Sequence, residues 1–305
     1  MTDVSRSLLQ AFGAYLTWGC FALFFHQLQH IPATEVLLHR LVWASLFVAI
    51  VLTLSRRWHT VRAALRKPRL VLQLFASSLF IATNWGVYIW SVSIGDAVGA
   101  SLGYFISPLI GIALGVWVLK ERLLPYQALA LSLAVIGVGY KIVGGHQIPW
   151  AALILATSFG LYGLIRKQTA VDTVTGLMIE SLLLLPFALA YWLWLAWHGE
   201  QHFSLSSDGL LLVSAGVLTA LPLLAFAAAA KHISLVVLGF MLYIAPSLQL
   251  LTGVYILGEP FGIDQQITFG FIFTGLLVIT GGALLQKQRA SNKEPIKNLS
   301  ISIRE

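Results

Sequence analysis

The chain has 305 residues, of which 58% are hydrophobic and only 10% are charged. A soluble domain carries about 25% charged residues because its surface must face water, so this composition excludes a soluble protein and predicts one that is embedded in a lipid bilayer. The net charge of +7 would suit a nucleic-acid partner. However, the basic residues lie in loops and form no groove with interleaved aromatic residues, so no such partner is expected.

Ten apolar runs of the chain are long enough to cross a bilayer, which takes about 20 residues of helix. Glycine, proline or charged residues separate these runs, and the runs lack the period-two alternation of barrel strands. Transmembrane helices are therefore expected at 8–27, 34–54, 70–91, 96–119, 123–141, 149–165, 174–197, 208–230, 234–257 and 266–286.

The lysines and arginines predict how these spans are oriented. If the N-terminus is cytoplasmic, every lysine and arginine except Arg40 and Lys141 falls in a cytoplasmic segment. This bias is what the positive-inside rule predicts for short loops. Both termini are therefore expected to be cytoplasmic.

One pattern occurs twice in the chain and predicts an internal duplication. A proline, six residues, a glycine, five residues and a glutamate are found at 108–121 and again at 246–259, each time in an apolar run. Each half then contains five spans, an odd number, so the second half enters the membrane from the opposite side. The predicted fold is an all-α polytopic membrane protein of ten transmembrane helices, arranged as two inverted five-helix repeats at 1–145 and 146–286. A disordered basic cytoplasmic tail is expected at 287–305.

One further similarity supports the duplication. Segment 17–19 in the first span reads Thr-Trp-Gly, and segment 158–160 in the sixth reads Ser-Phe-Gly. This match pairs the first span with the sixth. Arg40 in the second span and Glu180 in the seventh lie at corresponding depths, counted from opposite faces of the membrane.

Arg40 is a charged residue about two turns inside the second span. An arginine at the centre of a membrane helix costs about 2.5–3.5 kcal/mol on insertion scales, so it normally faces water or a partner. Three interpretations are open. The side chain snorkels to the outer surface, it pairs with Glu35 or Asp96, or it meets an anionic group of a substrate.

Glu180 has two interpretations of equal weight. Burial raises the pKa of a carboxyl group, so Glu180 could carry a proton through the membrane. Alternatively, Arg166 or Lys231 neutralises it and the pair serves assembly. The candidate carboxylates for proton coupling are Glu35, Asp96 and Glu180.

Polar and aromatic residues of several spans are candidates for a substrate cavity. Asparagine and glutamine in apolar spans often serve only as hydrogen-bonding contacts between helices, and aromatic residues often serve as packing or as an interface belt. The alternative is a cavity with aromatic walls and few polar groups, suited to a partly apolar organic molecule. The candidate residues are Trp18, Arg40, Asn84, Trp85, Tyr88, Tyr104, Tyr162, Tyr243 and Gln249.

Three prolines lie within predicted spans, where each frees a backbone carbonyl and bends the helix. Pro108, Pro222 and Pro246 are therefore candidate hinges, although a static bend is an equal alternative. The chain has no catalytic motif and no metal-ligand spacing, and its single cysteine, Cys20, allows no intramolecular disulfide. Neither an enzyme, nor a metal site, nor a cofactor is expected.

Together these features resemble a known family. The inverted repeat with its duplicated pattern is similar to the EamA-type drug/metabolite transporter superfamily, and segments 35–43, 84–90 and 102–109 resemble the RarD-type permeases, which are named for chloramphenicol sensitivity. Ser107 departs from that pattern, in which an asparagine is expected. The resemblance covers about residues 5–286.

The resemblance implies a multi-pass secondary transporter of the bacterial inner membrane that moves small organic metabolites or drug-like solutes by alternating access. The expected partners are a small-molecule substrate and the lipid bilayer, with protons and a second copy in a homodimer as open possibilities. Two other classes remain as alternatives. They are an intramembrane enzyme that modifies lipids, and a membrane sensor or assembly partner that transports nothing.

Overall fold

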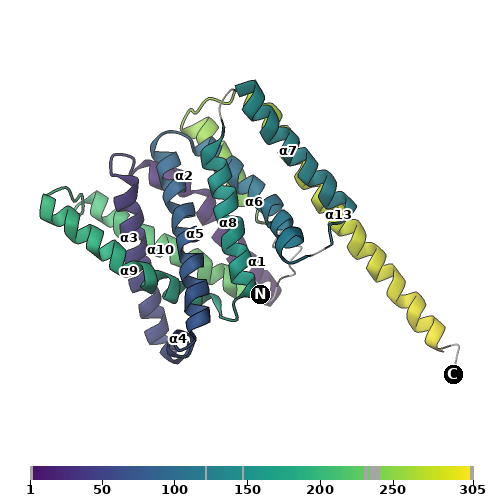
Figure 1. The fold of residues 1–305 in the computed structure, drawn as a ribbon, viewed down its shortest axis with the longest axis horizontal. Coiled ribbons are helices and arrows are strands. Elements are labelled where there is room, and N and C mark those ends of the chain that lie inside the picture. The colour runs from purple at the N-terminus through teal and green to yellow at the C-terminus, as the bar shows by residue number, and fades with distance from the viewer. Residues whose placement is uncertain (1–2, 121, 146–147, 230–232, 234–240, 303–305) are drawn as a thin grey trace. The chain divides into compact units, whose positions relative to one another are not determined.

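The computed structural model describes residues 3–120, 122–145, 148–229, 233 and 241–302. Every regular element within these residues is a helix, so the prediction of an all-α protein is confirmed (Figure 1). The elements are α1 (Asp3–Gly19), α2 (Phe21–His26), α3 (Ala33–Leu54), α4 (Trp58–Leu65), α5 (Pro68–Ser93), α6 (Ala97–Val118), α7 (Pro125–Gly145), α8 (Trp150–Gln168), α9 (Thr173–His198), α10 (Ser207–Ala229), α12 (Ile244–Leu251), η1 (Thr252–Ile256, a π-helix) and α13 (Ile263–Ser302).

Eight helical stretches in the described part of the chain are long and apolar enough to cross a membrane. These are the α1–α2 stretch and α3, α5, α6, α7, α9, α10 and α13. The predicted span 149–165 forms α8, which falls outside this set. The predicted span 234–257 is described only from 241 onward, where it contains the short apolar helix Ile244–Ile256. The protein is therefore a multi-pass membrane protein, and the count of ten spans stays a prediction.

Local sequence explains where several helices begin and end. The side chain of Asp172 accepts a hydrogen bond from the backbone N–H of Thr175 and so caps the start of α9. Gly199, with φ of +68°, ends the same helix in the left-handed region that glycine adopts without strain. Pro68 occupies the first turn of α5, where its missing N–H is not needed.

The chain divides into two compact units. The first contains residues 1–114 and 150–260, and the second contains 115–149 and 261–305. Each unit contains helices from both halves of the sequence, which pack against each other within it. The repeat boundary at 145 stays a prediction.

In the second unit, α7 packs along α13 (Figure 1). The Tyr126 hydroxyl donates to Gln286 Oε1 at 2.8 Å, and the Tyr140 hydroxyl donates to Asp264 Oδ1 at 3.4 Å. These bonds join the start of each helix to a later part of the other, so α7 and α13 are antiparallel. The helical backbone of α13 continues to Ser302, where a disordered tail was expected after residue 286. Extending an existing helix costs less than nucleating a new one.

In the first unit, the most extensive helix contacts join the two halves of the sequence. Helix α3 packs on α9 and α10, α5 packs on α8 and α9, and α1 packs on α10 and α12. Lipid tails are as apolar as leucine, so these contacts depend on close packing and on hydrogen bonds between helices rather than on exclusion of water.

Gly103 on α6 is one place where the close packing can be tested. A Cβ atom at this position would lie 2.8 Å from the Ala152 carbonyl oxygen and 2.8 Å from the Leu155 Cβ on α8. Gly103→Val is therefore expected to destabilise the protein by about 1–3 kcal/mol through overpacking, measured by unfolding in detergent. Gly111→Val is the matched control, because a Cβ there meets nothing within 4 Å. Equal stability of both variants would contradict the close contact.

Candidate functional site

The Arg40 side chain is held inside the first unit. It is 3% exposed, and its Nε donates to Thr219 Oγ1 on α10 at 2.7 Å. The guanidinium carbon lies 4.3 Å from the ring centroid of Trp85, 5.3 Å from that of Phe21 and 5.4 Å from that of Phe25. Arg40 is thus enclosed by aromatic rings, to which a cation is attracted electrostatically.

Asn84 on α5 links three helices. Its Nδ2 donates to the Leu155 carbonyl at 2.9 Å and to Ser158 Oγ at 3.2 Å, both on α8. Its Oδ1 accepts from the Tyr104 hydroxyl on α6 at 3.0 Å. Asn84 is 1% exposed, so its amide positions α5, α6 and α8 relative to one another.

Tyr88 lies one turn after Asn84 on α5. Its ring centroid is 5.6 Å from that of Tyr104 and 6.0 Å from that of Phe25. The side chain is 1% exposed, and its hydroxyl has no hydrogen-bond partner among the described residues. We call the set Arg40, Asn84, Trp85, Tyr88 and Tyr104 the aromatic site.

The other predicted cavity residues lie in separate contacts. Tyr162 reaches Tyr104 only through Phe159, whose ring centroid is 6.2 Å from each of them. Tyr243 stacks on Phe105 with a centroid distance of 6.3 Å. No contact in the described part of the chain joins Tyr243 to the aromatic site.

Trp18 and Gln249 meet where the first span is interrupted. Helix α1 ends at Gly19 and α2 begins at Phe21. The Gln249 Nε2 of α12 donates to the Trp18 carbonyl at 3.0 Å, and α12 leaves no room for a Cβ at Gly19, which would lie 2.6 Å from Leu248 Cδ1. Gln249 therefore supports a break in a membrane helix, a role that its position in the sequence did not reveal.

Glu180 lies in a second buried cluster, at the contact of α5, α8 and α9. It is 2% exposed, accepts a hydrogen bond from Ser77 Oγ, and lies 3.8 Å from Arg166 Nε. The Arg166 guanidinium lies against Gly176, where a Cβ would overlap it. Of the two interpretations of Glu180, the pair with Arg166 is seen; Lys231 lies outside the described residues, and proton transfer stays a prediction.

The other candidate carboxylates, Glu35 and Asp96, make local structural contacts. Glu35 is fully buried and accepts two hydrogen bonds at 2.7 Å from His202, one from its backbone N–H and one involving Nδ1. Asp96 Oδ1 accepts from the Gly99 N–H at 3.1 Å in the first turn of α6. No ion pair recorded among the described residues joins either of them to Arg40, and the pairing of Arg40 with Glu35 or Asp96 stays a prediction.

Two of the three candidate hinge prolines lie inside continuous helices. These are Pro108 in α6 and Pro222 in α10. Pro246 lies in the first turn of α12, where a proline breaks no helical hydrogen bond. Pro186, inside α9, is another helix-interior proline and was not among the predicted hinges. Whether any of them acts as a hinge stays a prediction.

Glu259 is a functional candidate. It is the glutamate of the second Pro–Gly–Glu pattern, but the pattern alone did not predict its role. Its two carboxylate oxygens accept the backbone N–H groups of Ala97 and Val98, each at 2.7 Å. These are the first residues of α6, whose N-terminal N–H groups have no partner within the helix. The glutamate of the second pattern therefore caps the helix that carries the first. Glu121, its counterpart, lies outside the described residues.

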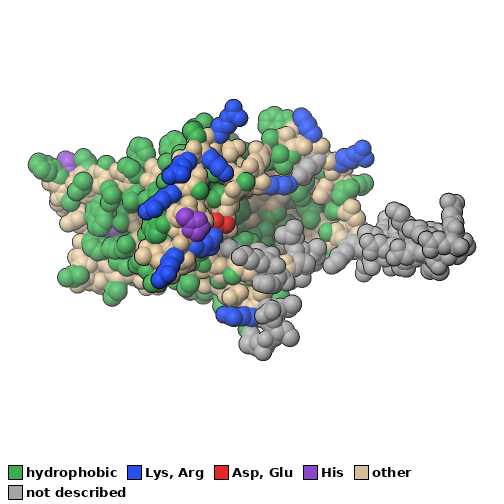
Figure 2. Space-filling view, turned by 90° about the horizontal axis from the view of Figure 1, so that it is seen from below, with side chains coloured by type: hydrophobic (Ala, Val, Ile, Leu, Met, Phe, Trp, Pro, Cys, Tyr) green, Lys and Arg blue, Asp and Glu red, His purple; other side chains and the backbone are tan. Residues whose placement is uncertain are grey.

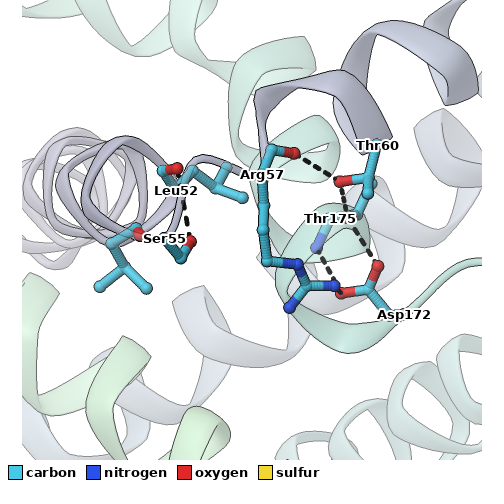
Figure 3. Close-up of polar contacts among 7 residues, drawn as sticks. Leu52, Ser55, Arg57, Thr60, Asp172 and Thr175 are labelled. Atoms are coloured by element: carbon cyan, nitrogen blue, oxygen red, sulfur yellow. Dashed lines mark hydrogen bonds and ion pairs between the residues drawn. The ribbon is translucent and has the colours of Figure 1, made fainter.

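A polar contact joins α4 to the start of α9 (Figure 3). Arg57 Nη2 lies 3.3 Å from Asp172 Oδ1, the Thr175 hydroxyl donates to Asp172 Oδ2 at 2.7 Å, and the Thr60 and Thr175 hydroxyl oxygens are 2.7 Å apart. Val61 of α4 is buried. Figure 2 shows basic side chains spread over the face seen from below in Figure 1. The exposed lysines and arginines of segment 55–69 are Arg56, Arg62, Arg66, Lys67 and Arg69.

Asp172 makes the start of α9 sensitive to acid. Burial alone would raise the pKa of its carboxyl group, but hydrogen bonds from Thr175 and the charge of Arg57 lower the pKa below its usual value of 3.8. Asp172→Ala is expected to cost about 1 kcal/mol at neutral pH, the usual effect of a lost N-cap. A carboxyl group with a lowered pKa stabilises the fold above its unfolded-state pKa and loses this contribution as the pH falls through its folded-state value. The stability difference between wild type and variant should therefore shrink below pH 4, and a constant difference would contradict the assignment.

Comparisons with known proteins agree with these features. The sequence profile described as "EamA-like transporter family" matches residues 5–140 and 148–281. An "Uncharacterized transporter" of Vibrio cholerae is 42% identical over 91% of this chain and 93% of its own, and "Protein RarD" of Escherichia coli is 38% identical over 94% and 97%. One solved crystal structure has a TM-score of 0.58 at 21% identity, covering 90% of this chain and 96% of its own, which is a likeness of fold alone. The chain therefore belongs to the EamA-like transporter family and is a RarD-like permease.

Proposed function

We propose that the protein is a secondary transporter that moves small organic solutes across the bacterial inner membrane by alternating access. Its ten helices form two inverted five-helix repeats, at 1–145 and 146–286, with both termini in the cytoplasm. It performs no catalysis. Membership of the family supports transport, and the family profile's two successive matches support the duplication.

The helix contacts of the first unit support the relation between the halves. If the two halves exchange places, the first span corresponds to the sixth, the second to the seventh, and the eighth to the third. The contact of α1 with α10 then becomes that of α8 with α5, and the contact of α3 with α10 becomes that of α9 with α5. All four contacts occur, as a two-fold axis between the repeats requires.

The aromatic site is the proposed binding site for the solute. The observation that supports it best is the convergence of a cation, an amide and a phenol group, all nearly fully buried, with the partly buried Tyr104, on first-half helices that bond to Thr219 and Ser158 of the second half. A membrane span holds such groups at a cost, and they usually mark a substrate or ion pathway. Trp18, Tyr162, Tyr243 and Gln249 form the surrounding wall in this proposal.

Exchange of labelled solutes in proteoliposomes tests the proposal. With a mixture of labelled aromatic and aliphatic metabolites, wild type is expected to exchange a subset. Asn84→Leu and Tyr104→Phe should each reduce that exchange by about tenfold, because each removes a hydrogen bond at a buried polar group.

Thr274→Val is the control, because Thr274 is exposed on α13 and its hydroxyl bonds only its own helix at Gly270. Thermal unfolding of each variant separates lost transport from lost folding, and Tyr104→Phe removes a single oxygen atom. Exchange at the wild-type rate in both site variants would remove the aromatic site from the proposal. Exchange that follows an imposed pH gradient would add proton coupling, for which Glu180 is the first carboxylate to test.

A further inference from the structure

Arg40 and Glu180, two charged residues buried in the spans, occupy equivalent places in the two halves. Arg40 on α3 bonds to the Thr219 hydroxyl on α10, and Glu180 on α9 bonds to the Ser77 hydroxyl on α5. The Arg40–Thr219 contact joins the second and eighth spans, and the Glu180–Ser77 contact joins the seventh and third spans. Exchange of the halves therefore turns one contact into the other, with the sign of the charge reversed.

The two sites differ in their counter-ions. Glu180 is faced by Arg166 on α8, at 3.8 Å. The match of segment 17–19 with segment 158–160 places Phe25 at the position equivalent to Arg166. The Phe25 ring does lie beside Arg40, at 5.4 Å. An aromatic ring thus stands in the first half where the second half has a counter-ion.

No carboxylate in the described part of the chain forms an ion pair with Arg40. Six carboxylates of the first unit have other partners: Glu35 bonds His202, Asp96 accepts from the Gly99 N–H, Asp172 pairs with Arg57, Glu180 with Arg166, Asp208 with His30, and Glu259 caps α6. A buried charge with no opposite charge is strongly unfavourable. Cation–π contacts and one hydrogen bond to Thr219 satisfy only part of a guanidinium that has five N–H donors.

We propose that Arg40 binds the carboxylate group of the transported solute, so that the cargo is a small organic anion with an aromatic or apolar body. This inference rests on the proposed function and names its substrate class. The planar guanidinium fork matches a carboxylate with two parallel hydrogen bonds. The buried Tyr88 hydroxyl, which has no partner among the described residues, supplies a further donor beside Phe25. Trp85 and Tyr104 provide apolar surface for the body of the solute.

Matched pairs of probes test this assignment in full-length protein held in phosphatidylcholine nanodiscs. Each pair replaces a charged carboxylate with a neutral amide of nearly the same shape: benzoate and benzamide, phenylacetate and phenylacetamide, indole-3-acetate and indole-3-acetamide. Calorimetry and thermal unfolding measure the binding of each probe. At least one carboxylate is expected to bind wild type about tenfold more tightly than its amide, because hydrogen bonds to a charged group are worth more than neutral ones. This comparison requires no variant to fold.

Variants then assign the preference to Arg40. Arg40→Gln should remove the difference within each pair, whereas Arg40→Lys should keep part of it. Arg62→Gln removes the same charge from an exposed position on α4 and should leave the difference unchanged.

Three results of the binding experiments would overturn the proposal. They are carboxylates that bind no better than their amides in wild type, a preference that survives Arg40→Gln, and a preference that disappears when phosphatidylglycerol is added, which would assign Arg40 to a lipid headgroup. Exchange of neutral solutes alone in the proteoliposome assay would also overturn it and leave the proposed transport intact. Absence of any exchange would instead contradict transport itself.

Discussion

Breaking the Arg166–Glu180 pair from either side is expected to lower the free energy of unfolding by about 3–5 kcal/mol. The Glu180 side chain is 3% exposed and that of Arg166 is 15% exposed, so Glu180→Gln or Arg166→Gln leaves the remaining charge with little water to solvate it. The effect should be large for Glu180→Gln as well, because the Arg166 guanidinium lies against Gly176 and is mostly shielded from water. Reversible unfolding in mixed detergent measures each loss.

The double variant Arg166→Gln/Glu180→Gln, which combines the two single changes, separates the ion pair from simple packing. Removing both charges leaves neither uncompensated, so the double variant should be more stable than either single one. Arg62→Gln, which removes an exposed arginine, should change the unfolding free energy by less than about 0.5 kcal/mol. Losses that simply add in the double variant would show that the two side chains act independently, contrary to the structure.

Glu259→Gln is expected to destabilise the protein by about 3 kcal/mol, because two hydrogen bonds to a carboxylate are weakened together. The glutamine side chain has one carbonyl oxygen and no charge, so it can accept only one of the two N–H groups at Ala97 and Val98. It also loses the favourable interaction of a negative charge with the positive end of the helix dipole of α6. Hydrogen exchange at residues 97–100 should become faster in the variant.

Glu200→Gln is the control for this prediction, since Glu200 is exposed in the loop after α9. Unchanged exchange at the start of α6 in Glu259→Gln would contradict the cap. If the two halves are related by duplication, Glu121→Gln should have a similar effect on the start of the predicted span 234–257.

The sequence predicted the architecture well because the membrane imposes strong local rules. Apolar runs of about 20 residues had to be helices, and most of the predicted runs are described as such. Asn84, Trp85 and Tyr88 share one segment of α5, so their proximity followed from helical spacing alone. The break at Cys20 was not predictable, because it depends on Gln249, which lies far away in the chain.

Contacts between helices could not be predicted from the sequence, because they also join residues that lie far apart in the chain. The position of Arg40 over Trp85 depends on the register of α3 against α5, which composition does not specify. The role of Glu259 depends on a turn at Gly258, whose φ of +69° is available to glycine without strain and directs the next side chain toward α6. The repeated pattern revealed that this glutamate matters, but only the structure connects it to the start of another helix.

The opposite orientation of the two halves is the central claim, and cysteine accessibility tests it most directly. Arg62 lies between the second and third spans, and Glu200 lies at the equivalent place between the seventh and eighth. In a Cys20→Ser background, Glu200→Cys should react with a membrane-impermeant maleimide in intact cells. Arg62→Cys should react only after the membrane is opened. Labelling of both positions from the same side of the membrane would contradict the inverted repeat and the alternating-access transport proposed from it.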